Sequence, residues 1–481
     1  MSNFMIAAIF AISINAIADD NKFSYYLNAY LKVNPSYRQA LISEKTAKMD
    51  NKAGNLAMWM PSLSSSFSKS WSYTEADETT HTASKQLSLG LSGSLTRYGL
   101  SYSTTLYSDS RSESFFYGTQ TTKSHTGSYS YSASIDLLRG NGYSVGHISF
   151  DNLDIAEKKA YLNRKSTLLS GTKSLLDAYI NVRTVEFEMD STMQELEKNE
   201  VETRKEMLKY KLGKIPRLNI LNRQTQRENF KSRIISSKRS MIAAKKSLFD
   251  VIGKDFGEDE RQKLSLEPID RDIFDDKKIE TWLAEKIEFK TLKNIDYIRA
   301  RLDLQSTRLS IQSSKNNLLP SLKITGSKSY SQKAQERQTR PFQDTANSDS
   351  VSISFSMPIG FVDERNSYRK ARMNYHNQVH QFKVTKQQIL REWDQLKTDY
   401  LFALEELDTI KNLTEVARSR YQSALPTASL GSTYQDNILT YQTELLDFSQ
   451  KLNKKLNDIF LLKVQMYTFH GDVSYIEKLK K

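Results

Sequence analysis

Polar and apolar residues alternate along several short stretches of the chain. From Ser62 to Ser72 every even position is serine, while the odd positions include Leu63, Phe67 and Trp71. The runs 128–137 and 350–357 likewise set Tyr, Ala, Val, Ile, Leu, Phe and Met against serines, with one aspartate. A period of two, with one apolar and one small polar face, predicts β-strands that lie between two different environments.

Two arrangements explain such strands. A soluble sandwich also alternates, but strands of transmembrane barrels are runs of about ten residues, apolar toward lipid and polar toward the lumen. The serine-rich face is very hydrophilic, which favours a barrel with a water-filled lumen. The first half of the chain has an additional alternating hairpin at 85–108, whereas the second half has only a polar stretch, 332–350. The sequence leaves open whether this hairpin adds strands to a barrel.

Long helical patterns separate the strand regions. Residues 147–212 contain no proline and a single glycine, Gly171, and a helix of that length approaches ~100 Å at ~1.5 Å per residue. Apolar residues at three- and four-residue spacing predict coiled-coil seams, which must pack against neighbouring helices. The expected seams are Leu175, Tyr179, Val182, Met189, Met193 and Leu196 in the first half, and Phe382, Ile389, Trp393, Leu396, Tyr400, Ala403, Leu407, Ile410, Ala417 and Tyr421, then Ile438, Tyr441, Leu445, Phe448, Leu452, Leu456 and Ile459, in the second.

The chain also repeats itself. WMPSLSSSFSKSW (59–71) aligns without gaps with LLPSLKITGSKSY (318–330), and NPSYRQA (34–40) echoes NIDYIRA (294–300). Gly213 and Gly431 mark two turns, each followed at the same distance by Ile-Leu. These matches predict a duplicated unit of helix, β-hairpin, long helix, tight turn and returning helix.

The repeat divides the chain into segments. An apolar run ending in Ala16-Ile17-Ala18 predicts a signal peptide over 1–18. We expect the first repeat at 19–252, with strands at about 62–137 and a helical hairpin at about 147–252, and an inter-repeat segment at 253–293. The second repeat is expected at 294–470, with strands at about 321–357 and a hairpin at about 366–470, before a tail at 471–481.

Composition and charge narrow the possible functions. The chain has no cysteine, which excludes disulfides, thiolate metal sites, cysteine nucleophiles and a lipid anchor on an N-terminal cysteine. Its net charge of +13 invites a nucleic-acid partner. However, Lys and Arg are interleaved with Glu and Asp along helical segments, which indicates solvated helix faces and no nucleic-acid partner.

Motifs of catalysis and metal binding are absent from the sequence. HNQVH (376–380) places His376 and His380 one helical turn apart, but it lacks the glutamate of a zinc-protease motif and a third ligand. There is no P-loop, no G-x-S-x-G and no dinucleotide fingerprint. We therefore expect no enzyme, no cofactor and no metal site, so that energy for any transport must come from a partner.

In its order of motifs the chain resembles the TolC family of outer-membrane efflux proteins. The resemblance rests on N-P-x-x-R-x-A at 34–40, P-S-L at Pro61 and Pro320, SIDLLRG (134–140), SFSMPIG (354–360) and Y-x-x-G at 210–213. It implies an α+β, mainly α fold: a homotrimer that shares one transmembrane β-barrel, continued by a long periplasmic α-helical coiled-coil tunnel. The implied location is the outer membrane, extending into the periplasm, in contact with outer-membrane lipid.

The resemblance also implies partners and site residues. The partners are a periplasmic adaptor (membrane-fusion) protein and an inner-membrane transporter, and the tunnel is closed at the tips of its helical hairpins. Family members often carry aspartates six and nine residues after the turn glycine, where this chain has mostly neutral residues. The tip and gate positions are Asn219, Asn222, Asp436, Asn437 and Thr440, and the adaptor-docking turns are Leu212, Gly213, Leu430 and Gly431.

Three functions compete on this evidence. The leading hypothesis is a passive outer-membrane exit duct of a tripartite efflux pump or a type I secretion system. The alternative is a trimeric coiled-coil surface fibre or adhesin with a barrel anchor, although the heptads turn back at Gly213 and Gly431. A cytosolic nucleic-acid-binding scaffold rests only on the net charge, and the serine-faced strands argue against it.

Overall fold

A computed structural model describes residues 22–57, 60–74, 80–95, 98–115, 121–140, 143–253, 266–270, 273–289, 292–336, 342–357, 359–426 and 432–480. The chain forms two compact units. The helical unit comprises Met1–Ser43, Tyr161–Ile298 and Val384–Lys481, and the sheet unit comprises Glu44–Ala160 and Arg299–Lys383. The expected signal peptide at 1–18 lies outside the described residues.

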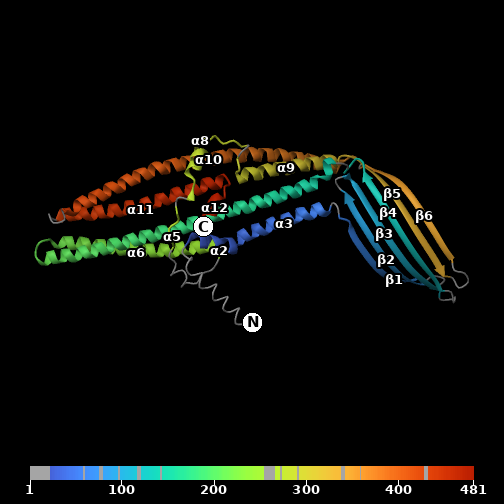
Figure 1. Cartoon of the computed structure of the whole chain (residues 1–481), viewed down its shortest axis with the longest axis horizontal. Helices are drawn as coiled ribbons and strands as arrows, with labels where there is room; N and C mark the ends of the chain where they lie inside the picture. Colours follow the sequence, from blue (N-terminus) through green and yellow to red (C-terminus); the bar gives the residue numbers. More distant parts are fainter. Residues whose placement is uncertain are drawn as a thin grey trace. The chain divides into compact units, whose positions relative to one another are not determined.

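The sheet unit contains one antiparallel sheet of six strands in sequence order (Figure 1). The strands are β1 (Ser62–Thr74), β2 (Thr80–Leu95), β3 (Leu100–Phe115), β4 (Thr121–Asp136), β5 (Ser321–Glu336) and β6 (Phe342–Ser356). The additional hairpin that the sequence left open is thus β2 and β3, and it lies inside the sheet between β1 and β4. The described residues of the polar stretch 332–350 belong to β5 and β6, so in the described structure the first half of the chain supplies four strands and the second half two.

The two faces of this sheet differ in chemistry along its whole width. One transverse row joins a serine from each of the six strands: Ser62, Ser92, Ser103, Ser132, Ser327 and Ser350. Within it the hydroxyls pair across strands, at 2.8 Å for Ser62 and Ser92, 2.7 Å for Ser103 and Ser132, and 2.6 Å for Ser327 and Ser350. We call this side of the sheet the serine face.

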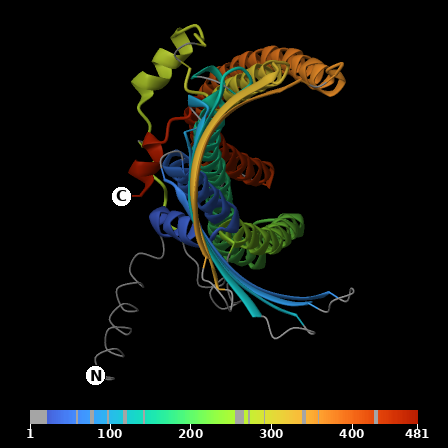
Figure 2. The same ribbon diagram turned by 90° about the vertical axis from the view of Figure 1, so that its right-hand side faces the viewer.

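The opposite side, which we call the apolar face, carries the leucines and aromatics of the alternating runs. In β4 the side chains of this face are exposed, whereas those of the serine face are partly or fully covered. Figure 2 shows the sheet as a strongly curved arc. Side chains on the convex side of a curved sheet spread apart, so these exposures indicate that the apolar face is convex and the serine face concave.

The strands are joined to helix ends that belong to the same unit. Strand β1 follows α3 (Pro35–Ala57), and β5 follows α9 (Ile295–Asn316). After β4 the chain passes through α4 (Tyr143–Gly146) into α5 (Ile148–Lys211). Polar contacts fix these helix ends to one another: Lys159 of α5 forms an ion pair with Asp303 of α9 at 2.6 Å.

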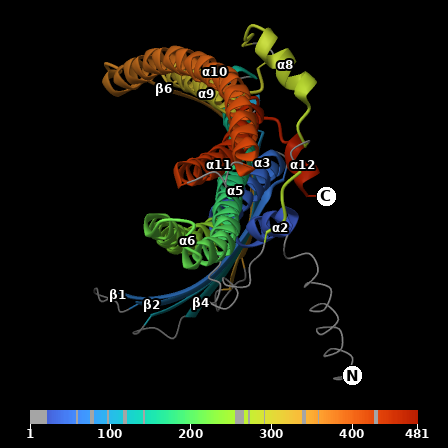
Figure 3. The same cartoon turned by 90° about the vertical axis from the view of Figure 1, so that its left-hand side faces the viewer.

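The helical unit is built from two long helical hairpins. The first pairs α5 with α6 (Arg217–Ile252), and the second pairs α10 (Val362–Ala424) with α11 (Ser432–Phe469), as Figure 3 shows. The shorter helices α2 (Phe23–Val33), α8 (Asp276–Ala284) and α12 (Ser474–Leu479) complete the unit. The predicted combination of a mainly helical chain with one sheet is confirmed. None of the described helices combines the length and the hydropathy of a membrane-spanning helix.

Two asparagines occupy equivalent positions in the two halves of the chain. Asn34 Oδ1 accepts the Tyr37 backbone N–H at 3.0 Å, and its Nδ2 donates to the Val251 carbonyl, at the end of α6, at 2.8 Å. Asn294 Oδ1 accepts the Tyr297 N–H at 3.1 Å, and its Nδ2 donates to the Phe469 carbonyl, at the end of α11, at 2.9 Å. Each asparagine thus caps the start of one helix, α3 or α9, and is hydrogen-bonded to the end of the returning helix of the same repeat, α6 or α11. The equivalent contacts support the internal duplication.

Close packing explains the single glycine of the long helix α5. A Cβ atom at Gly171 would lie 1.7 Å from the Tyr30 hydroxyl oxygen of α2. Neighbouring side chains Leu175, Tyr179 and Val182 are fully buried. Helix α2 can therefore approach α5 only where the side chain is absent.

Beyond Val182 the packing seam of α5 differs from the expected one. Met193 is 37% exposed, so it does not belong to the seam that packs within a single chain. The buried positions instead follow at intervals of seven: Val185, Thr192, Asn199 and Glu206. Three of these four are polar, which is why a search for apolar periodicity missed them. In α10 the expected seam is buried at Ile389, Trp393, Leu396, Tyr400, Ala403 and Ala417.

Candidate functional site

The first hairpin turn has a well-defined glycine cap. The Gly213 N–H donates to the Tyr210 carbonyl at 2.8 Å, and the Lys214 N–H donates to the Lys209 carbonyl at 2.9 Å. These two hydrogen bonds form a Schellman motif, in which the residue after the helix adopts the left-handed backbone conformation. Gly213 fulfils that requirement with φ of 71°.

The surface around this turn is apolar and basic. Leu208, Leu212 and Leu218 are each more than 60% exposed. The sequence from 207 to 227 contains no Asp or Glu but several Lys and Arg. We call residues 207–218 the basic tip. Because exposed leucines are unfavourable in water, this surface is suited to binding a partner.

The second turn lies mostly outside the described residues. Leu430 and Gly431 are among the residues that are not described, and so is the side chain of Asp436. Asn437 and Thr440, in the first turns of α11, are exposed. In the first hairpin, Asn219 is buried and Asn222 is partly buried near the start of α6. The tip and gate assignment of these residues stays a prediction.

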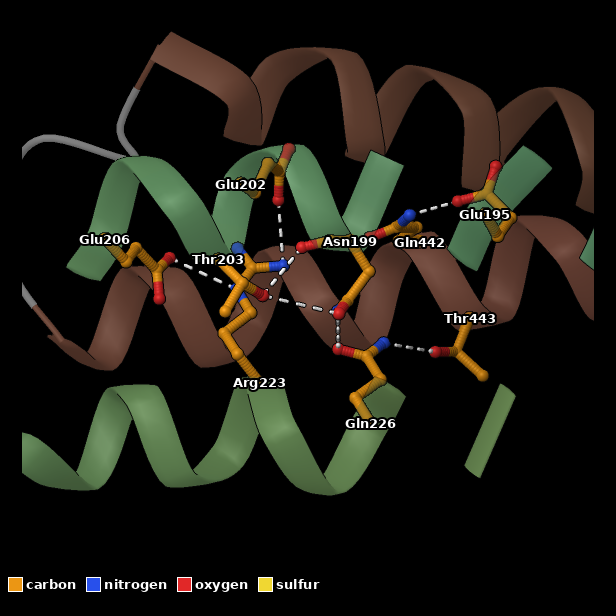
Figure 4. Close-up of polar contacts among 9 residues, drawn as sticks. All are labelled: Glu195, Asn199, Glu202, Thr203, Glu206, Arg223, Gln226, Gln442 and Thr443. Atoms are coloured by element: carbon orange, nitrogen blue, oxygen red, sulfur yellow. Dashed lines mark hydrogen bonds and ion pairs between the residues drawn. The ribbon is translucent and has the colours of Figure 1, made fainter. Parts of the chain in front are cut away.

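A buried ion pair lies close to the basic tip, between α5 and α6 (Figure 4). Arg223 Nε donates to Glu206 Oε1 at 3.1 Å, and Arg223 Nη1 lies 2.8 Å from Glu202 Oε2, without the geometry of a hydrogen bond. The Arg223 side chain is only 4% exposed and that of Glu206 only 6%. The arginine therefore lies between two carboxylates in a place that water hardly reaches.

The cluster extends to α11 through amide side chains. Asn199 Nδ2 donates to Gln226 Oε1 at 3.3 Å, and Gln226 Nε2 donates to the Thr443 hydroxyl at 3.4 Å. Gln442 Nε2 donates to Glu195 Oε2. Three helices of two different hairpins thus meet in one polar cluster, drawn in Figure 4.

Further from the tip, α11 and α5 remain joined by polar contacts. Gln450 Nε2 donates to the Ser191 hydroxyl at 3.1 Å, and Asn457 Nδ2 donates to the Thr184 hydroxyl at 3.0 Å. We call this series of contacts, with the cluster around Arg223, the polar seam. Water can replace hydrogen bonds of this kind when helices separate, whereas an apolar seam would expose hydrophobic surface.

The electrostatics of the polar seam are set by burial. Burial raises the pKa of the Glu206 carboxyl, and the guanidinium of Arg223 partly opposes this shift. A buried ion pair contributes little net stability, but breaking it by removing one partner is strongly unfavourable. The Arg223–Glu206 pair therefore fixes how α5 and α6 align within the first hairpin more than it adds to the stability of that hairpin.

Sequence reasoning missed the seam residues because it looked for apolar positions. The signal that could have found them is the seven-residue spacing of Thr192, Asn199 and Glu206, which continues the heptad of Val185 in polar residues. It also looked for metal ligands at His376 and His380, both of which are exposed on α10. Among the described residues, no group of three or more His, Asp or Glu could hold a metal ion.

Comparison with known proteins identifies related families and folds. Residues 293–457 match the family model of outer membrane efflux proteins. Comparison with curated proteins gives no sequence match. The resemblance to TolC-type efflux proteins is confirmed, and so is the prediction that the chain is not an enzyme, since the matching family consists of transport proteins.

Solved channel structures share the fold over almost the whole chain. The outer membrane protein VceC of Vibrio cholerae has a TM-score of 0.64 at 12% identity, with 94% of this chain and 96% of VceC covered. The MtrE outer membrane channel of Neisseria gonorrhoeae, in its open state, has a TM-score of 0.65 at 13% identity, with 94% and 89% covered. The CmeC outer membrane channel of Campylobacter jejuni has a TM-score of 0.65 at 13% identity, with 95% and 89% covered.

Proposed function

We propose that this chain, whose residues 293–457 match the family model of outer membrane efflux proteins, is the outer-membrane exit duct of a tripartite efflux pump or type I secretion system. It conducts small molecules or proteins passively from the periplasm to the outside. Its place is the outer membrane, with the helical hairpins in the periplasm.

The observation that carries this proposal is the unclosed sheet. Strands β1, with 13 residues, and β6, with 15, form its two edges. In the described structure no other strand pairs with the outer side of either one. Exposed apolar side chains flank both edges, such as Leu63 and Phe67 on β1 and Val351 on β6. Sheet edges within a lipid bilayer must be paired, because no water is present to satisfy their backbone groups.

Three copies arranged in a ring would pair these edges. An even number of antiparallel strands makes β1 and β6 run in opposite directions, so β6 of one copy can pair with β1 of the next as the existing strands do. Three copies of six strands each give 18 strands, and barrels of roughly 16–18 strands enclose an aqueous channel. The serine face then lines the channel, and the apolar face contacts lipid.

The basic tip is the proposed docking surface for a periplasmic adaptor. Exposed Leu212 and the Gly213 turn, with Leu430 and Gly431 of the second hairpin, would bind apolar side chains of the adaptor, while the nearby lysines favour an acidic partner. An inner-membrane transporter bound to that adaptor supplies the energy.

Opening of the tunnel would separate α11 from the first hairpin along the polar seam. Asn219, Asn222, Asp436, Asn437 and Thr440 lie at or near the ends of the helices that would move. Such a rigid-body change needs a partner that binds the open state more tightly than the closed one. We expect the adaptor to be this partner and to bind at the basic tip.

A surface fibre or adhesin with a barrel anchor remains the alternative. Its coiled coil would need helices that run outward and end there, whereas α5 and α6 are joined by a tight turn and contact each other antiparallel through Glu206 and Arg223. Strands contributed by both halves of the chain also favour the duct.

The decisive experiment is the mass of the particle that detergent extracts from the outer-membrane fraction. We expect about three times the 55.3 kDa of one chain, less the signal peptide, and dissociation to single chains on heating. A protein absent from the membrane fraction, or a membrane-bound monomer, would contradict the proposed duct, because one copy leaves both sheet edges unpaired.

A further inference from the structure

The apolar face changes character near the strand ends that lie away from the helices. There, one transverse row consists of Lys69 on β1, Lys85 on β2, Ser110 on β3, His125 on β4, Ala334 on β5 and Gln343 on β6. We call it the basic row. Lys69 and Lys85 are direct cross-strand partners, and like charges in such a position destabilise a strand pair.

Acidic partners do not compensate these two lysines within the described part of the chain. The basic row itself contains no Asp or Glu. Elsewhere on the same face the pattern differs, since Lys328 Nζ lies 3.4 Å from Asp349. An anion from outside the chain, held between Lys69 and Lys85, would remove their mutual repulsion.

An aromatic ring accompanies the basic row. Lys69 Nζ lies 4.5 Å from the centre of the Trp71 ring, the next residue on this face toward the strand end. Trp71 is 69% exposed. Tryptophan and lysine are both common where a membrane protein meets the headgroup layer of the bilayer. The basic row therefore has the composition of a membrane–water interface.

A groove of about 520 Å³ begins next to the basic row on the side toward the helices. Its walls include Leu87, Leu106, Tyr129 and Tyr330, and the two tyrosine rings stack at 5.1 Å. Its floor includes Gly127, where an added Cβ atom would meet nothing within 4 Å. Leu87 follows Lys85 by two positions on the same face, which is about 7 Å along a strand. The groove and the row can thus be reached by one molecule.

We propose that the basic row and this groove bind a phosphorylated lipid of the outer leaflet. Its phosphate lies between Lys69 and Lys85, and one acyl chain lies along Leu87 and the Tyr129 ring. The inference rests on the proposed function, since only a barrel turns the apolar face toward lipid. The row lies toward the strand ends opposite those that α3 and α9 join, and in the proposed duct this places it in the outer leaflet. A lipid whose headgroup also carries an amine binds less well, because the amine repels the lysines.

Lipid retention by the membrane-extracted trimer tests the proposal. The trimer is incubated with phosphatidylcholine vesicles that contain an acylated disaccharide with or without its phosphates, re-extracted and analysed by native mass spectrometry. We expect the phosphorylated glycolipid to be retained in preference to its dephosphorylated form. Lys69→Gln with Lys85→Gln should lower its retention roughly 30-fold, the order expected for the loss of two lysine–phosphate contacts.

Two further variants separate the parts of the site. Lys323→Gln with Lys333→Gln removes the same charge from the serine face of the same sheet, and we expect it to retain the lipid like the unmodified protein. Gly127→Leu fills the groove and should lower retention while the lysines are intact. Because open space surrounds Gly127, this variant keeps the sheet.

Three results would overturn the inference: equal retention by the Lys69→Gln/Lys85→Gln variant, equal retention of the dephosphorylated lipid, or full displacement of the lipid by inorganic phosphate at the same concentration. The last result would show a site for phosphate alone. In each case the trimer is already in the membrane extract, so the proposed duct stands. A chain missing from the membrane extract would instead contradict the duct itself.

Discussion

Single residues determine how the basic tip is shaped and what it can bind. Gly213 adopts φ of 71° and closes the Schellman motif, while its neighbour Leu212 is fully turned to solvent at 69% exposure. A residue with a Cβ atom is unfavourable in this conformation by about 1–2 kcal/mol. The turn can therefore present Leu212 in this way only with glycine, or with asparagine at a smaller penalty.

Replacing both turn glycines, Gly213→Leu and Gly431→Leu, should weaken adaptor binding at least tenfold and leave trimer assembly intact. The strained turn changes the position of Leu212, whereas the barrel is untouched. Binding of the purified trimer to its adaptor and efflux in cells measure the effect. Gly213→Asn is the matched control, since asparagine tolerates the left-handed conformation. Normal efflux by the double Leu variant at normal expression would show that these turns are not the docking site.

Glu206 is the residue through which pH acts on the polar seam. Its pKa is raised by burial above that of an ordinary carboxyl group. The stability linked to Glu206 is therefore fully present below the unfolded pKa and is lost as pH rises through the raised folded pKa. Glu206→Gln should remove this pH dependence, while Glu197→Gln at an exposed position of α5 should not. Amide hydrogen exchange of the α5–α6 segment, corrected for intrinsic rates, measures it. An unchanged slope in Glu206→Gln would assign the dependence to another group.

At the scale of elements, the short helix α8 is held by an aromatic cluster around His470. Trp282 of α8 stacks on the His470 ring at 4.2 Å, and Trp393 of α10 meets the same ring edge-on at 5.0 Å. Lys278 of α8 also forms an ion pair with Asp472. His470 Nε2 is buried without a hydrogen-bond partner among the described residues. Burial lowers the pKa of His470 to about 4, although Asp472 opposes the shift.

Acid should therefore release α8. Because the folded pKa of His470 lies below its ordinary value of 6.5, stability is fully present above that value and is lost as pH falls toward 4, by on the order of 2–3 kcal/mol. Proteolysis or hydrogen exchange of α8 between pH 7 and 4 follows the release. His470→Phe should remove most of the effect, and His376→Phe, at an exposed site, should not. A pH profile unchanged by His470→Phe would rule out this histidine.

The sequence allowed the regular elements to be anticipated better than the contacts between them. Alternation in β1 and β4 and the proline-free run of α5 are local patterns, and each is visible without knowing its neighbours. The seam residues Asn199 and Glu206 are recognisable only from what surrounds them, because polar side chains carry no apolar periodicity. The position of the β2–β3 hairpin within the sheet depends on strand pairing, which a single strand does not specify. Site residues at the second turn remain predictions.

At the scale of the whole molecule, the β2–β3 hairpin determines the proposed width of the channel. Deleting residues 80–120 leaves residues 75–79 to connect β1 to the start of β4 and leaves four strands that still alternate in direction. The register keeps serines opposite serines, since Ser62, Ser92, Ser103 and Ser132 share one row. The shortened chain therefore retains what it needs to form a smaller barrel.

We expect this deletion variant to form a trimer with a single-channel conductance roughly half that of the full chain. Barrel diameter grows about linearly with strand number, so the cross-sectional area of the channel scales roughly with the square of the strand number. Planar-bilayer recordings of both purified trimers measure the ratio. Equal conductance in the two trimers would mean that the hairpin lies outside the conducting wall or that the helical tip limits the current.

The paired hydroxyls of the serine face have a consequence for whatever passes along it. Ser103 with Ser132, and Ser327 with Ser350, share one hydrogen bond across the strands, so each pair keeps one donor and three acceptor sites for water. A solute that moves past this row therefore meets a hydrated, uncharged surface that interacts alike with many polar molecules. Such a surface discriminates little, so recognition of what is exported must take place before the solute arrives there.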